Sequence, residues 1–82
     1  MRYILFTQPF CYKCPSAEKL MIHLPYKGLI VNCQKDFSEA VKFKILQTPT
    51  LLIINDNNKE VGRYNSIEDI KLFVEEATGK LL

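Results

Sequence analysis

Short apolar runs alternate along this chain with segments in which apolar residues recur every three or four positions. Three runs predict buried strands because they are continuous, short and rich in branched side chains, at residues 2–7, 29–33 and 50–54. The polar run Asn55 to Asn58 favours a tight turn. Residues 59–64 therefore predict a short fourth strand that forms a hairpin with the third.

Helical spacing predicts three helices between and after these strands. The first ends near Pro25 and buries Ala17, Leu20, Met21 and Leu24. The second begins at Asp36, with Glu39 in the place of a capping-box acid, and follows the spacing of Phe37, Ala40, Val41, Lys44 and Ile45. The third begins at Ser66 and ends at Gly79, with an inner face of Ile67, Ile70, Phe73, Val74 and Ala77.

The predicted order of elements is β-α-β-α-β-β-α. A helix between the first two strands implies a right-handed parallel crossover, and the hairpin adds an antiparallel pair. We therefore expect an α/β fold with a four-stranded mixed sheet and helices on both faces. The 82 residues leave room for one small domain, residues 1–82.

Composition excludes several classes of protein. A chain that is 48% apolar and 24% charged is too hydrophobic for disorder. No apolar run approaches the ~18 residues of a membrane span, and the first seven residues contain no apolar stretch long enough for a signal peptide. The net charge of +2 is spread without a basic stripe. We expect a cytoplasmic monomer that binds neither membranes nor nucleic acid.

The candidate chemistry lies in a C-x-x-C motif between the first strand and the first helix. Cys11 and Cys14 stand at the N-terminal end of that helix, where free N–H groups and a partial positive charge favour a thiolate. Lys13 adds a cation. A cysteine pKa of ~8.5 falls to roughly 3.5–7.5 in such places. We expect Cys11 to be the nucleophile, Cys14 the resolving thiol, and Pro15 the first regular helical residue.

A zinc site is the alternative interpretation of the motif. Zinc needs four ligands, and the remaining soft ligands are Cys33 and His23. Cys33 ends the second strand and His23 lies at the far end of the first helix, so we expect no metal site. We interpret His23 as a surface residue. Cys33 is interpreted as a small buried hydrophobe, although the carboxyl end of its strand is where α/β sheets place their sites.

The order strand, C-x-x-C, helix, then Thr48-Pro49-Thr50 before an apolar strand resembles the thioredoxin and glutaredoxin superfamily. The resemblance covers essentially the whole chain. It implies the thioredoxin fold, a dithiol-disulfide oxidoreductase activity and a cis bond before Pro49 beside the active-site sulfurs. The backbone at Thr48 would then bind an extended substrate segment. Tyr12 and Phe10 either pack the loop or form a docking rim for that substrate.

The run from Cys11 to Pro15 and the chain length resemble small glutaredoxin-like thioredoxins of archaeal type. The match to ordinary thioredoxins is incomplete, because Leu5 stands where they carry a buried aspartate and Phe10 where they carry a tryptophan. The residues between the cysteines, Tyr12 and Lys13, also differ from the thioredoxin pair.

The match to glutaredoxins is incomplete too. Their glutathione-binding glycine pair is Gly62-Arg63 here, and the Thr-Asp or Ser-Asp that follows it is Asn65-Ser66. Ser66 at a helix start offers N–H groups to a carboxylate. Arg63 is interpreted as a solvated charge that is also able to pair with a carboxylate.

The resemblance implies that the chain reduces disulfides in other proteins, ribonucleotide reductase being one candidate. We expect the chain to hold no bound cofactor. Reducing equivalents then come from a thioredoxin reductase-like enzyme or from glutathione, and we favour the reductase. In this hypothesis the Cys11 thiolate attacks the substrate and Cys14 releases it. The alternative is a non-catalytic binding module, or a metal or iron–sulfur carrier that uses Cys11.

Overall fold

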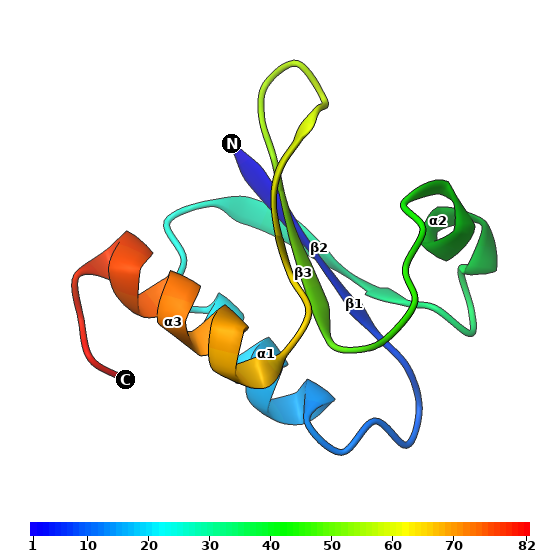
Figure 1. The fold of residues 1–82 in the computed structure, drawn as a ribbon, viewed down its shortest axis with the longest axis horizontal. Coiled ribbons are helices and arrows are strands. Elements are labelled where there is room, and N and C mark those ends of the chain that lie inside the picture. The colour runs from blue at the N-terminus through cyan, green and yellow to red at the C-terminus, as the bar shows by residue number, and fades with distance from the viewer.

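The computed structural model describes all 82 residues and contains a four-stranded sheet with three helices (Figure 1). In chain order the elements are β1 (Arg2–Thr7), α1 (Cys14–Met21), β2 (Lys27–Asn32), α2 (Phe37–Lys42), β3 (Thr50–Ile54), β4 (Glu60–Tyr64) and α3 (Ile67–Thr78). The strand order is β2-β1-β3-β4. β1 is parallel to β2 and antiparallel to β3, which is antiparallel to β4. The predicted element order and mixed sheet are confirmed.

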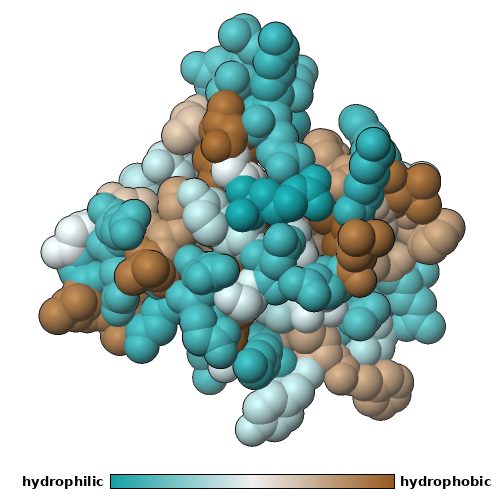
Figure 2. All heavy atoms as spheres, viewed as in Figure 1, coloured by the Kyte–Doolittle hydropathy of each residue, from teal (hydrophilic) through white to brown (hydrophobic).

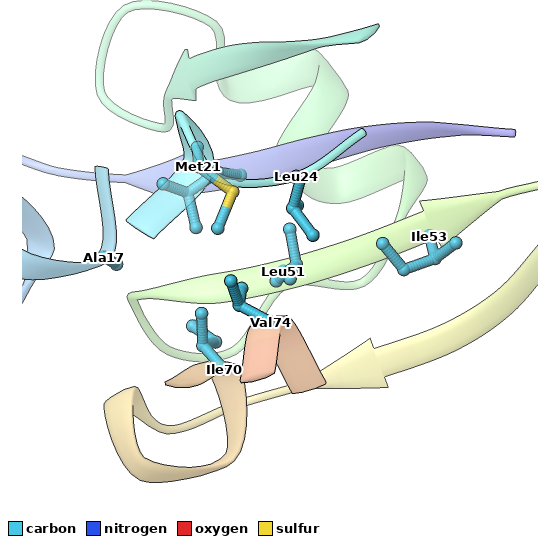
Figure 3. Close-up of a cluster of buried hydrophobic side chains, with 8 residues drawn as sticks. Ala17, Met21, Leu24, Leu51, Ile53, Ile70 and Val74 are labelled. Atoms are coloured by element: carbon cyan, nitrogen blue, oxygen red, sulfur yellow. The ribbon is translucent and has the colours of Figure 1, made fainter. Parts of the chain in front are cut away.

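The two central strands supply most of the core. All five residues of β3 are buried, because this strand pairs along both edges and is covered on both faces. Alternate side chains of β1 and β3 point to opposite faces and divide the core into two clusters. The larger cluster lies under α1 and α3 and consists of Leu5, Ala17, Met21, Leu24, Leu51, Ile53, Ile70 and Val74 (Figure 3).

The helices on this face begin and end close to where the sequence predicts. α1 begins at Cys14, one residue earlier than expected, with Pro15 in its first turn. It ends at Met21, and Leu24 stays buried in the turn that follows. α3 starts as predicted, because the Ser66 side chain accepts a 3.1 Å hydrogen bond from the Asp69 N–H.

The opposite face of the sheet is covered less by α2 than by the segment behind it. Phe43 and Ile45 pack against the smaller cluster of Ile4, Phe6, Leu52 and Ile54. Within α2 only Ala40 is buried, whereas Phe37 and Val41 are exposed. The helix itself is therefore confirmed, but the helical spacing that the sequence continues to Lys44 and Ile45 is not, because the helix ends at Lys42.

The capping box predicted at the start of α2 is also absent. Asp36 is the N-cap residue, but its side chain makes no cap hydrogen bond. It accepts instead a 3.2 Å hydrogen bond from the Ser38 hydroxyl. The Asp36 carboxylate therefore accepts a hydrogen bond from a neighbouring side chain and none from the backbone N–H groups of the helix.

β2 is a strand, but it is not the buried strand that its apolar run predicts. It pairs only with β1 and forms one edge of the sheet, with Leu29 61% and Ile30 45% exposed. An apolar run indicates strand structure, whereas burial depends on whether helices cover that strand. β4 forms the other edge and carries Glu60 and Arg63. Its pairing with β3 shifts register between Ile53 and Ile54.

Arg63 is not the solvated charge that its surroundings in the sequence predict. Its Nη2 donates to the Phe43 carbonyl at 2.6 Å, and its Nε and Nη2 donate to the Glu60 carboxylate at 2.8 Å. Nη1 also reaches the Lys44 carbonyl at 3.4 Å. The guanidinium therefore ties β4 to the end of α2, just before the loop that leads into β3.

We predict that Arg63→Met lowers the free energy of unfolding by about 1–3 kcal/mol, because a partly buried carbonyl and a carboxylate lose their donor. Urea unfolding measures this difference, and Arg63→Lys, which keeps the charge without the planar fork, is the matched control.

The loss in Arg63→Met should depend on pH. The Arg63 hydrogen bond lowers the pKa of Glu60 below its ordinary value of 4.5. The stabilisation is therefore complete above that ordinary value and is lost as the pH falls through the lowered one. The gap between wild type and variant should narrow below about pH 4. An undiminished gap in acid would contradict this account.

Candidate active site

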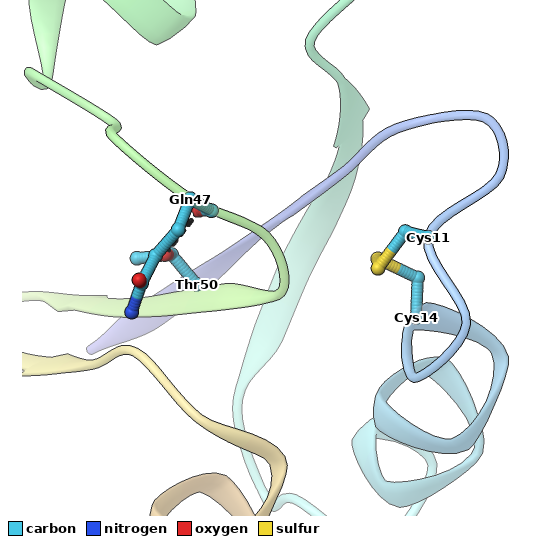
Figure 4. Close-up of a disulfide and its surroundings, with 4 residues drawn as sticks. All are labelled: Cys11, Cys14, Gln47 and Thr50. Carbon is cyan, nitrogen blue, oxygen red and sulfur yellow. Dashed lines mark hydrogen bonds between the residues drawn. A yellow bond between two sulfur atoms is a disulfide. The ribbon is translucent and has the colours of Figure 1, made fainter.

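A disulfide joins Cys11 and Cys14 in the turn between β1 and α1, with the two Cα atoms 5.4 Å apart (Figure 4). The turn is held by hydrogen bonds from the Cys11 N–H to the Gln8 carbonyl and from the Cys14 N–H to the Cys11 carbonyl, both 3.3 Å. Cys14 is only 3% exposed and Cys11 is partly exposed. Cys11 is therefore the more accessible of the two cysteines.

Two aromatic side chains project into solvent beside Cys11. Phe10 has a φ of +63°, which an ordinary L-residue rarely adopts, and its ring is fully exposed. Tyr12 is also largely exposed. Neither ring packs the loop, so of the two interpretations from sequence, a rim around the dithiol agrees with the structure.

Lys13 occupies the N-cap position of α1, and its side chain does not cap the helix. Its Nζ lies 3.4 Å from Oε1 of Glu68 in the first turn of α3, and both side chains are exposed. Hydrogen bonding from its own backbone N–H, together with the Lys13 charge, lowers the pKa of Glu68. The cation expected to favour the Cys11 thiolate is therefore already paired with a carboxylate.

The loop before β3 bends toward the disulfide (Figure 4). The Thr48–Pro49 peptide bond is cis, and Pro49 is buried. The Gln47 amide donates to the Asn65 carbonyl at 2.8 Å, and the Thr50 hydroxyl donates to the Gln47 carbonyl at 2.7 Å. The first bond fixes the loop to the segment between β4 and α3, and the second closes the loop onto the first residue of β3.

An apolar groove of about 550 Å³ runs beside the disulfide-bearing turn and the loop before β3. Its walls come from four separate segments: Gln8, Pro9, Phe10, Cys33, Gln34, Phe37, Ala40, Ile45, Leu46, Gln47 and Thr48. Leu46 is 95% exposed, and Figure 2 shows apolar surface gathered over α2 and its neighbouring loops. The sequence does not reveal this groove, because its walls meet only through the fold.

Cys33 follows β2 at the same end of the sheet as the dithiol, but it packs on the opposite face from α1. Its N–H donates to the Thr7 carbonyl at 2.8 Å, and its side chain packs against the smaller core cluster while lining the groove. Burial raises the pKa of the Cys33 thiol above its ordinary value. It is therefore less ionised at neutral pH than a free cysteine.

The two residues expected to receive a carboxylate have roles in the fold. A Cβ at Gly62 would lie 3.1 Å from the Tyr64 ring, which stacks on Phe73. Ser66 caps α3. The first turn of that helix also carries Glu68 and Asp69, whose charges oppose the binding of another carboxylate there.

No group of three or more His, Cys, Asp or Glu side chains lies close enough together to hold a metal ion. His23 is exposed at the end of α1. None of the three helices combines the length and the apolar character that a membrane crossing requires.

Comparison with known proteins gives one clear sequence relative. No family model matches the chain. A protein named Probable Thioredoxin from Archaeoglobus fulgidus is 38% identical over 64 residues, which cover 71% of this chain and 69% of that protein.

Two solved structures share the fold at low sequence identity. Thioredoxin 1 of Thermosipho africanus TCF52B superposes with a TM-score of 0.73 at 14% identity, over 92% of this chain and 88% of that one. The reduced Schistosoma mansoni thioredoxin pre-protein gives 0.71 at 21% identity, over 92% and 76%. The structural likeness therefore extends over most of both chains.

We predict that iodoacetamide, at mildly acidic pH, labels Cys11 of the reduced protein well before Cys14 and Cys33. Cys14 is buried, and burial raises the pKa of Cys33. Peptide mapping at short reaction times measures the order, and the urea-unfolded protein, in which all three thiols are accessible, is the control. Equal labelling of the three in the folded protein would contradict this assignment.

Proposed function

Because this chain belongs to the thioredoxin family and is a thiol-disulfide oxidoreductase, we propose that Cys11 and Cys14 are its redox pair and that its substrates are disulfides in other proteins. The observation that carries the proposal is the disulfide itself. It closes at the N-terminal end of a helix, with one sulfur partly exposed and the other buried.

The proposed reaction has two exchange steps. The Cys11 thiolate attacks one sulfur of the substrate disulfide, forming a mixed disulfide and releasing the other substrate sulfur as a thiolate. The Cys14 thiolate then attacks the Cys11 sulfur, which closes the intramolecular disulfide and releases the second substrate sulfur. Two electrons pass from the dithiol to the substrate, whose thiolates take up protons from water. The reaction needs no bound cofactor.

The start of α1 favours ionisation of the reduced thiols. Free N–H groups and the partial positive charge at this helix end stabilise a thiolate, and the first turn carries no acidic residue. Beneath the site, Leu5 is fully buried in the apolar core, so β1 offers no carboxylate there to accept a proton from Cys14. The helix end and Lys13 are the proposed means of lowering the thiol pKa values.

The surroundings of the dithiol support a polypeptide substrate. The exposed side chains of Phe10, Tyr12 and Leu46 offer apolar contacts around the site, and the groove continues them. The backbone at Thr48, beside the buried Pro49, is proposed to pair with an extended substrate segment as an added strand. Ribonucleotide reductase is one member of this substrate class.

A protein reductase is the proposed source of electrons. Glutathione brings two carboxylates, and the α3 start that would receive one already holds its own cap and two acidic residues. The Tyr64 ring covers the side of Gly62 where a Cβ would lie, at 3.1 Å, which narrows the approach of a ligand to this backbone. A dithiol electron donor is suited to a reducing compartment, and the cytoplasm is the proposed location. The proposed state is a monomer, since the exchange steps require a single copy of the chain.

We predict that Cys14→Ser converts the protein into a trap, because the mixed disulfide at Cys11 then lacks an internal thiol to resolve it. A disulfide-containing protein should accumulate as a covalent adduct on non-reducing gels. Cys11→Ser should form no adduct, and Cys33→Ser should retain full turnover. Multiple turnover by Cys14→Ser without an added thiol would disprove the dithiol mechanism.

The choice of reductant is tested by recharging the oxidised protein. Thioredoxin reductase should regenerate the dithiol much faster than glutathione supplied with glutathione reductase, since the Tyr64 ring narrows the approach to the backbone at Gly62. NADPH consumption measures both series. Fast turnover with glutathione that is lost in Ser66→Ala would contradict this choice and would indicate a glutaredoxin-like protein that glutathione recharges.

A further inference from the structure

One ion pair connects the active-site turn to a distant part of the sequence. Lys13 stands between the two cysteines, and its Nζ is 3.4 Å from Oε1 of Glu68, 55 residues further along the chain. The side chains are 54% and 69% exposed. The pair therefore links the N-terminal ends of α1 and α3, which pack side by side on one face of the sheet (Figure 1).

We propose that Glu68 is a positioning residue that holds the Lys13 ammonium and thereby makes the Cys11–Cys14 dithiol more reducing. The inference rests on the proposed function, in which Cys11 acts as the thiolate. In the disulfide form Cys11 carries no charge, so Glu68 is the anion that Lys13 contacts. Once the disulfide is reduced, the Cys11 thiolate becomes a second anion near Lys13.

Two effects of Glu68 on the thiolate have the same sign. Its carboxylate competes with the thiolate for Lys13, and its negative charge repels a thiolate at the neighbouring helix end. Both effects destabilise the ionised dithiol relative to the disulfide. A less stable reduced form gives up its electrons more readily, so Glu68 favours reduction of the substrate.

Glu68 is the carboxylate in contact with Lys13, and its surroundings keep it ionised. The pKa of Glu68 is lowered by its own backbone N–H and by Lys13. The other acids of these two helix ends are Asp69, beside it in the first turn of α3, and Glu18 on α1. The loop before β3 and the segment after β2 present uncharged residues to the groove: Cys33, Gln34, Leu46, Gln47 and Thr48.

The test compares Glu68→Gln with Glu76→Gln, the same change on an exposed residue eight positions further along α3. A unit charge roughly 10 Å away through water changes a proton affinity about twofold. Glu68→Gln should therefore raise the alkylation rate of Cys11 about twofold at pH values below its pKa. At pH values above that pKa, where reduced Cys11 is a thiolate, it should also shift the redox equilibrium with dithiothreitol about twofold toward the dithiol form of the protein.

Two further measurements separate this effect from a change in structure. In about 1 M NaCl, where the screening length is ~3 Å, both shifts should largely disappear. In a Lys13→Gln background, Glu68→Gln should have a smaller effect than in wild type, because part of it acts through Lys13. Glu68→Asp, which retains the charge, should restore most of the wild-type equilibrium.

The proposal is overturned if Glu68→Gln matches Glu76→Gln in both assays, or if its shifts persist unchanged at high salt. Failure of the proposed function would give a different result. The wild-type protein would then not reduce protein disulfides, while the effect of Glu68 on the alkylation of Cys11 would still be measurable.

Discussion

The pairing of β3 with both of its neighbours determines where the chemistry is placed. β3 is buried along its whole length, and its first residue, Thr50, pairs with Phe6 near the end of β1. Because the two strands are antiparallel, the turn that leaves β1 and the loop that enters β3 emerge at the same end of the sheet. The dithiol and the cis-proline are thus brought together by strand register, although 34 residues lie between Cys14 and Pro49.

Polar contacts then hold the loop before β3 in place. Arg63 fixes the end of α2 to β4, Gln47 fixes the loop to the segment before α3, and the Thr50 hydroxyl closes the loop onto the Gln47 carbonyl. Each contact joins a backbone carbonyl to a side-chain donor, so the loop is constrained without regular structure of its own. The groove beside the dithiol therefore has walls that are defined before a substrate arrives.

Much of this molecule follows from local patterns in the sequence. The apolar run of β3, the cap at Ser66 and the left-handed Gly79 depend on neighbouring residues alone, and these predictions are confirmed. The position of Cys11 and Cys14 after β1 likewise predicted a pair able to form a disulfide. The exposed face of β2, the partners of Arg63 and the groove depend on contacts between segments far apart in the chain. Periodicity carries no information about such contacts.

The two edges of the sheet differ in their ability to accept another strand. β4 presents charged side chains and lies opposite an irregular register, both of which discourage pairing. β2 is regular, and Gly28 to Asn32 contains no charge and no proline. The sheet is therefore able to grow in one direction only. A strand added there in an engineered fusion would extend the fold beyond β2 and leave the β3–β4 hairpin that holds the cis-proline loop unchanged.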